Sequence, residues 1–150
     1  MSKKVEYFAY GSNMSTERLQ DRVSSAEPLG CAKLPDKRLV CNKKSKDGSG
    51  KANLTDTAGD TVWGVLYEID SAELDNLDRC ECGYTRISLD VKTDQDSSVK
   101  AYVYVSSELI EDARPYDWYK KLMIKGAREH QLPAFYVTRL EQIDSKPSPD

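Results

Sequence analysis

The ten residues Val5–Met14 constrain this chain most, because they combine a strand, a sharp turn and the start of a helix. Residues 5–10 alternate, and four of these six are β-branched or aromatic, which is typical of a strand. Gly11–Asn13 favours a turn, and Ser15–Glu17 opens a polar segment with apolar residues at helical spacing. A strand that turns directly into a helix presents unpaired backbone N–H groups near the positive end of the helix dipole. The segment therefore predicts an anion-binding turn.

The same residue types also form ordinary strand-to-helix connections that bind nothing, so the turn alone leaves both interpretations open. Nucleotide-binding loops are excluded by their motifs. The chain has no G-x-G-x-x-G, and Gly48–Lys51 lacks the upstream Gly and the following Ser or Thr of a P-loop.

Size and charge narrow the class of protein. A chain of 150 residues predicts one domain, residues 1–150, with a frayed tail at about 145–150. The net charge of −3 argues against a general nucleic-acid binder, and a mean hydropathy of −0.66 without a long apolar run argues against a membrane span. Four cysteines without a C-x-x-C pair, and no apolar signal segment near residue 1, predict a reducing, cytoplasmic location. We expect the partner to be a small molecule or a protein.

The single histidine, His130, excludes zinc sites built from several histidines and leaves one candidate base for any Ser-His or Cys-His triad. It lies near the end of a helical pattern, where we expect a surface imidazole facing the helix C-terminus. Any proton transfer then depends on a carboxylate or a tyrosine.

The other elements follow from periodicity. Strands are predicted at Arg38–Cys41, Thr61–Ile69, Arg86–Val91 and Val99–Val105. The second of these is the most apolar and is expected in the core, after a turn at Gly59 and Asp60. Helices are predicted at Tyr116–Arg128 and from Pro133, with Ile143 closing the last apolar stripe.

The run Asn42–Lys51 is polar, contains glycines and carries four lysines. A solvated hairpin connection explains this composition, and a lid that attracts anionic substrates remains the alternative. The run supports no site assignment by itself.

Glu81 occupies an unusual corner between a short helix and a strand. Asp70–Glu73 has the spacing of a capping box, and the helix that follows leads to Cys80, Glu81 and Cys82. Two small thiols on either side of the carboxylate are expected to desolvate it, which raises the pKa of a carboxyl and makes it a better base near neutral pH. An ordinary exposed corner glutamate is the alternative.

Several motifs, taken in order, resemble the γ-glutamylcyclotransferase family. They are Tyr7–Met14, Gly50–Asn53, Val62–Val65, Leu77 and Asp78 with Glu81, Tyr119–Lys121, Gly126 with Ala127, and Leu132 with Pro133. The first is shared with a wider AIG2-like superfamily, and the later ones make the match more specific. The resemblance implies an α+β fold, a small mixed β-barrel with flanking helices.

The resemblance also assigns roles. Glu81 is implied as the catalytic general acid and base, and the family needs no metal or cofactor. The implied substrate-binding residues are Tyr7, Phe8, Ala9, Tyr10, Gly11, Ser12, Asn13 and Tyr119. One departure is local: Cys82 follows Glu81 where the family usually has Gly, and Tyr84 comes sooner, so the outer wall of the pocket is expected to differ.

The implied activity is release of 5-oxoproline from γ-glutamyl-amino acids or γ-glutamyl amides, by attack of the substrate's own α-amine on its γ-carbonyl. Two alternatives remain open: a specialised γ-glutamylamine cyclotransferase or pathway deprotection enzyme, and a non-catalytic AIG2-like module that binds a small acid. The resemblance also favours a homodimer. The sequence does not choose the leaving group of the γ-glutamyl substrate.

Overall fold

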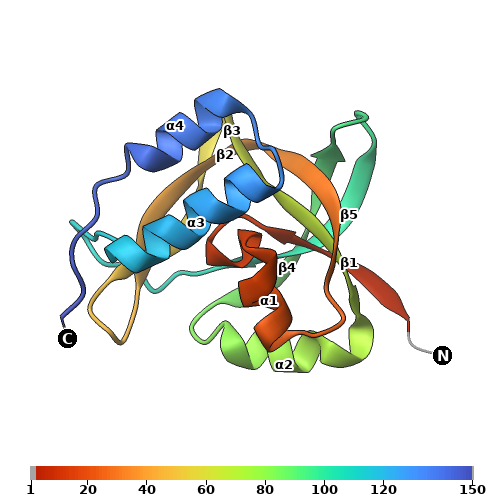
Figure 1. Cartoon of the computed structure of the whole chain (residues 1–150), viewed down its shortest axis with the longest axis horizontal. Helices are drawn as coiled ribbons and strands as arrows, with labels where there is room; N and C mark the ends of the chain where they lie inside the picture. Colours follow the sequence, from red (N-terminus) through yellow and green to blue (C-terminus); the bar gives the residue numbers. More distant parts are fainter. Residues whose placement is uncertain (1–2, 150) are drawn as a thin grey trace.

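A computed structural model describes residues 3–149, in which five strands form a closed barrel with helices on its outside (Figure 1). The strands are β1 (Lys4–Ala9), β2 (Glu27–Lys44), β3 (Gly50–Asp70), β4 (Thr85–Thr93) and β5 (Ser98–Val105). The helices are η1 (Ser12–Met14), α1 (Thr16–Arg22), η2 (Ser71–Glu73), α2 (Leu74–Cys80), α3 (Asp117–Glu129) and α4 (Ala134–Glu141), of which η1 and η2 are short 3-10 turns. The strand order around the barrel is β1-β3-β2-β4-β5, with β1 parallel to β5 and the other pairs antiparallel. The predicted fold class is confirmed.

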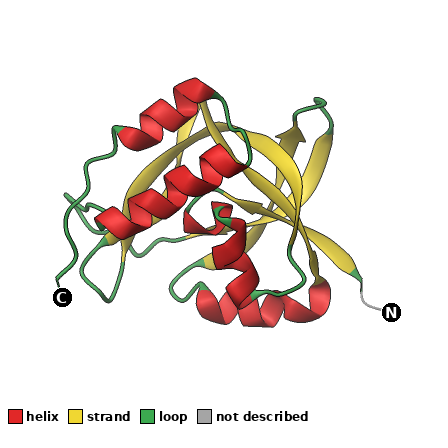
Figure 2. Cartoon of the chain, in the orientation of Figure 1, coloured by secondary structure: helices red, strands yellow, loops and turns green. Residues whose placement is uncertain are grey.

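Strands β2 and β3 form one long hairpin that curves around the barrel (Figure 2). This hairpin contains the predicted strand at Arg38–Cys41, which is part of β2, and the predicted turn at Gly59 and Asp60, which lies within β3. The bounds predicted for the strand and for the turn were therefore wrong. Register shifts in the β2–β3 pairing accommodate residues that do not fit a regular strand. Gly59, with a positive φ of 84°, lies in one of these shifts. Pairing with a neighbouring strand has overridden weak local strand propensity.

The core runs without a break from the barrel into the helices. Phe8 of β1 and Val62 and Tyr67 of β3 are fully buried, as are Leu19 of α1 and Met123 of α3. The apolar run predicted for the core is confirmed, because most of its residues from Val62 to Ile69 are buried. Among the helices described, none combines the length and apolar character needed to span a bilayer.

Two features near the C-terminus differ from expectation. Helix α4 ends at Glu141, so Ile143 packs against the core from beyond the helix. The predicted frayed tail makes defined contacts at its start: Ser145 Oγ donates to an Asp117 carboxylate oxygen, and Lys146 N donates to a backbone carbonyl before α3. Asp150 lies outside the described residues.

Helix α3 packs directly on the turn that follows β1, and Gly126 makes this close approach possible. A Cβ atom at Gly126 would lie 2.2 Å from the backbone carbon of Met14 and 2.5 Å from its carbonyl oxygen. No side chain can occupy that space without moving the helix or the turn. Gly126 therefore fixes the position of η1 against α3.

We predict that Gly126→Ala lowers the free energy of unfolding by about 1–3 kcal/mol, as overpacking does, although alanine favours helix by about 1 kcal/mol. Urea titration monitored by circular dichroism measures the change. Lys121→Ala, on an exposed position of the same helix, is the control and should stay within about 0.5 kcal/mol of wild type. A Gly126→Ala protein as stable as this control would contradict the packing argument.

Candidate active site

The turn that the sequence predicts after β1 is present as the 3-10 turn η1. Met14 N and Ser15 N close the 3-10 turn onto the carbonyls of Gly11 and Ser12. Within residues 3–149, no hydrogen bond occupies the N–H groups of Ser12 and Asn13, which are the first residues of η1. Both residues are buried at the edge of a pocket.

Gly11 is required here for space rather than for a special φ, since its φ of −113° is negative. A Cβ at this position would lie 3.0 Å from both Ala52 Cβ and Tyr119 Oη. Tyr119, from α3, accepts a hydrogen bond of 3.1 Å from Ala52 N and so holds the turn from the opposite side. The packing of Tyr119 on Gly11 joins two of the predicted site residues.

Glu81 follows α2 and is its C-cap residue. Asp70 caps the preceding 3-10 turn through a hydrogen bond from Ala72 N, but Glu73 does not complete the expected capping box and instead accepts from Ser25 N. Leu74 and Leu77 are buried and hold α2 against the fold. The end of α2 is thereby placed at the barrel mouth.

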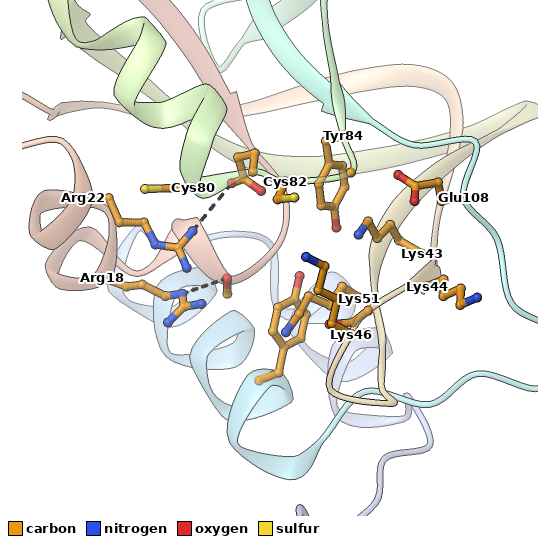
Figure 3. Close-up of a pocket in the computed structure, with 15 residues that line it drawn as sticks. Arg18, Arg22, Lys43, Lys44, Lys46, Lys51, Cys80, Cys82, Tyr84 and Glu108 are labelled. Atoms are coloured by element: carbon orange, nitrogen blue, oxygen red, sulfur yellow. Dashed lines mark hydrogen bonds and ion pairs between the residues drawn. The ribbon is translucent and has the colours of Figure 1, made fainter.

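The Glu81 carboxylate points inward and is joined to the turn by a hydrogen bond. Asn13 Nδ2 donates to Glu81 Oε1 over 2.7 Å and to Tyr7 Oη over 3.0 Å. Arg22 Nη1 lies 3.8 Å from the same carboxylate oxygen (Figure 3). The Glu81 side chain is only 15% exposed.

Burial raises the pKa of Glu81 above its ordinary value, while Arg22, the Asn13 hydrogen bond, Arg18 and Lys51 act in the opposite direction. A carboxylate in such an environment is a stronger base than one on the surface and still has cations that favour its ionised form.

The two flanking thiols are not the cause of this desolvation. Cys80 and Cys82 are both exposed. The expectation that they bury the carboxylate is therefore wrong. Residues from η1 and β1, brought together by the barrel, enclose Glu81 instead.

Tyrosines form much of the pocket wall. Tyr10 donates its hydroxyl to the Tyr104 carbonyl, Tyr104 donates to Asp78 over 2.6 Å, and Tyr84 donates to the Ala52 carbonyl over 2.6 Å. Burial raises the pKa of Tyr10, Tyr84 and Tyr104, so these phenols remain neutral. The wall is thus rigid, hydrogen-bonded and uncharged.

The pocket has two connected parts that share Ser12, Glu81 and Tyr84. An inner part of about 30 Å³ is lined by Tyr7, Tyr10, Gly11, Ser12, Asn13, Ala52, Glu81, Tyr84 and Tyr104. An outer cavity of about 470 Å³ is lined by Tyr119 together with many charged residues. Of the site residues predicted from the sequence, Phe8 and Ala9 line neither part, because their side chains are buried in the core.

Several residues of the site have no counterpart in the sequence-based assignment. These are Arg18, Arg22, Lys51, Tyr84 and Tyr104. Arg18 and Arg22 are four residues apart on α1, a spacing that puts both side chains on one helix face. That spacing, the lysine-rich run that ends at Lys51 and the short corner before Tyr84 were the available signals, whereas Tyr104 reaches the pocket through strand pairing.

His130 is less exposed than predicted. It is the C-cap of α3, but its side chain is 10% exposed, and Nε2 lies 2.7 Å from Thr16 Oγ1. Burial lowers the pKa of His130, and it lines neither part of the pocket. The prediction of a surface imidazole is wrong.

Comparisons with known proteins agree with this architecture. A sequence profile of the AIG2-like family matches residues 61–140. A γ-glutamylcyclotransferase from Homo sapiens is 35% identical over 147 residues, covering 92% of this chain and 78% of that protein, and one from Bos taurus is 34% identical over the same shares. A solved structure titled γ-glutamyl cyclotransferase has a TM-score of 0.90 and 30% identity, covering 99% of this chain and 92% of that one.

The family profile, together with the fold, thus places the chain among AIG2-like proteins. Within that class, the identity and coverage of these relatives are sufficient for assignment: the chain belongs to the γ-glutamylcyclotransferase family.

Because Arg22 is the largest influence that lowers the pKa of Glu81, we predict that Arg22→Gln raises that pKa further. Carbon-detected NMR titration of the glutamate carboxyl groups measures the shift directly and does not depend on activity. Arg79→Gln, an exposed arginine on α2, should leave the Glu81 titration unchanged. An equal titration midpoint in wild type and Arg22→Gln would show that Arg22 has no influence on the pKa of Glu81.

Proposed function

We propose that this protein is a γ-glutamylcyclotransferase that releases 5-oxoproline from γ-glutamyl-amino acids or γ-glutamyl amides. The observation that carries the proposal is the placement of Glu81, a nearly buried carboxylate with a raised pKa that lies at the junction of the two pocket parts and is hydrogen-bonded to the turn after β1. The relatives named above support the same reaction class.

The reaction needs no nucleophile from the protein, because the substrate carries its own. The α-amine forms a bond to the γ-carbonyl carbon and closes a five-membered ring, while the bond from that carbon to the leaving nitrogen breaks. Holding the glutamyl chain in a folded conformation makes the largest contribution to lowering the activation barrier, because oriented intramolecular attack can recover about 7–11 kcal/mol of that barrier. The rigid tyrosine wall beside Glu81 is suited to that task.

Glu81 performs the proton transfers in this proposal. Its carboxylate first takes a proton from the substrate's α-ammonium, which frees the lone pair for attack. It then gives that proton to the leaving nitrogen. A second proton passes from the attacking nitrogen to the amine product, so Glu81 ends as the carboxylate it was at the start.

Asn13 and the N–H groups of η1 supply the complementary contacts. Asn13 Oδ1 is buried and has no hydrogen-bond partner within the described chain, so it can accept a hydrogen bond from the α-ammonium. The N–H groups of Ser12 and Asn13 can donate to a substrate carboxylate or to the developing oxyanion. Such a preorganised donor contributes about 2.7–4 kcal/mol to transition-state stabilisation in other enzymes.

The proposal also includes a cellular location and an oligomeric state. A cytoplasmic location agrees with four free cysteines among the described residues. A homodimer remains a prediction from family resemblance, and light scattering of the purified protein would give its mass.

We predict that Glu81→Gln lowers kcat by about 10²–10⁴-fold, because glutamine keeps the size of the side chain and cannot accept a proton. Product formation is followed by chromatography of 5-oxoproline, with calorimetry of 5-oxoproline binding to show that the pocket remains intact. Asp75→Asn, an exposed carboxylate on α2, should retain wild-type turnover and serves as the control. Binding of 5-oxoproline without turnover in the wild-type protein would instead favour the non-catalytic module.

A further inference from the structure

The outer cavity is strongly basic, although the whole chain is acidic. Its wall carries six cationic side chains and only two carboxylates, Glu81 and Glu108, whereas the net charge of the chain is −3. The cations are Arg18, Arg22, Lys43, Lys44, Lys46 and Lys51. Such separation of charge marks a surface that attracts anions.

The cations come from two walls that face each other. Figure 3 shows Arg18 and Arg22 on α1 at one side, and Lys43, Lys46 and Lys51 from the β2–β3 hairpin at the other, while Lys44 points away. The hairpin interpretation of the lysine-rich run is correct as to structure, and the same hairpin also forms a wall of the pocket.

Most of this charge is not neutralised by the protein. Among residues 3–149, no carboxylate lies within ion-pair distance of Arg18, Lys43 or Lys46. Arg18 donates from Nε to Ser12 Oγ over 3.0 Å, and Lys43 Nζ lies 5.3 Å from the centre of the Tyr84 ring. These contacts position the cations and leave their charge available to a ligand.

Lys51 is held in a similar way. Its Nζ lies 4.9 Å from the ring centre of Trp118 and 4.8 Å from that of Tyr119, and it has one carboxylate neighbour, Asp47, at 3.5 Å. The Lys51 side chain is 22% exposed. A cation partly withdrawn from water in this manner interacts more strongly with an incoming anion than a fully exposed one.

The position of the cavity indicates which part of the substrate meets these cations. The inner part, at about 30 Å³, has room for about one water molecule, so a γ-glutamyl substrate must extend into the outer cavity. The glutamyl α-carboxylate can be bound by one cation or by the η1 amides. The remaining cations then face the leaving group.

We infer that the outer cavity selects substrates whose leaving group carries more than one negative charge, such as γ-glutamyl-glutamate, over those whose leaving group carries one negative charge, no charge or a positive charge. The inference rests on the proposed function and specifies its substrate class. It disfavours the alternative of a γ-glutamylamine cyclotransferase, because an amine leaving group lacks the carboxylates that these cations would bind.

The test compares γ-glutamyl-glutamate with γ-glutamyl-glutamine, which match in size and differ by one charge on the leaving group. We expect kcat/KM to be at least about fivefold higher for the first at low salt. The preference should fall as salt approaches about 1 M, where the Debye length is about 3 Å. γ-Glutamyl-butylamine, with no carboxylate on its leaving group, should be the poorest of the three.

Lys46→Gln and Lys51→Gln should each reduce the preference by about two- to fivefold, mainly through KM for γ-glutamyl-glutamate. Lys92→Gln, an exposed lysine outside the cavity, removes the same charge and should leave the preference unchanged. Both donors use the same carboxylate, so the part of a variant's effect on Glu81 that does not depend on the leaving group cancels in the ratio.

Equal kcat/KM for the two matched donors, or a preference that both cavity variants retain in full, would overturn the inference while leaving the proposed reaction intact. Absence of product from every donor would overturn the proposed function instead. In that case, calorimetric binding of the two donors to the wild-type protein still measures the charge preference of the cavity.

Discussion

The hydrogen bond from Asn13 Nδ2 to the Glu81 carboxylate is the contact on which the rest of the site depends. It joins the turn after the first strand to the end of α2, two segments 68 residues apart. A nearly buried carboxylate without a donor is costly, and hydrogen bonds to charged groups contribute about 1.5–3 kcal/mol. Asn13 meets this requirement and, through its second N–H, also orients Tyr7. One amide therefore fixes the Glu81 carboxylate relative to the barrel wall.

The barrel supplies the positions that this contact needs. Strand β1 lies between β3 and β5, so the turn that follows it opens at the barrel mouth, where Tyr104 of β5 and Ala52 of β3 also lie. Gly126 lets α3 press on this turn from outside. The turn is thus held by backbone packing on one side and by the site's hydrogen bonds on the other. Such support keeps the side chains of the candidate site in place without a ligand.

The sequence predicted features that arise from local pattern and missed those that arise from pairing. The strand and turn around Gly11 are encoded within ten residues, and the structure has both. The corner around Glu81 is visible in the sequence, and family resemblance implied the role of Glu81 as a base. The reason given for its desolvation was wrong, because Cys80 and Cys82 are exposed while Glu81 is nearly buried. Tyr104 reaches the pocket only through long-range strand pairing, whereas Tyr84 lies three residues after Glu81 in the same corner. The register shifts of the β2–β3 hairpin likewise depend on the partner strand.

Glu81 and the basic cavity are physically coupled. Burial raises the pKa of Glu81, and Arg22, Arg18 and Lys51 oppose that effect, so these cations of the outer cavity also favour the ionised form of the carboxylate. A leaving group with two carboxylates would partly neutralise the same cations when it binds. The pKa of Glu81 would then rise in the complex, and the carboxyl would hold its proton more firmly after taking it from the α-ammonium. In the proposed reaction, the charge of the substrate and the proton affinity of Glu81 are therefore coupled through the same cations. The basic wall would then influence both substrate binding and proton transfer.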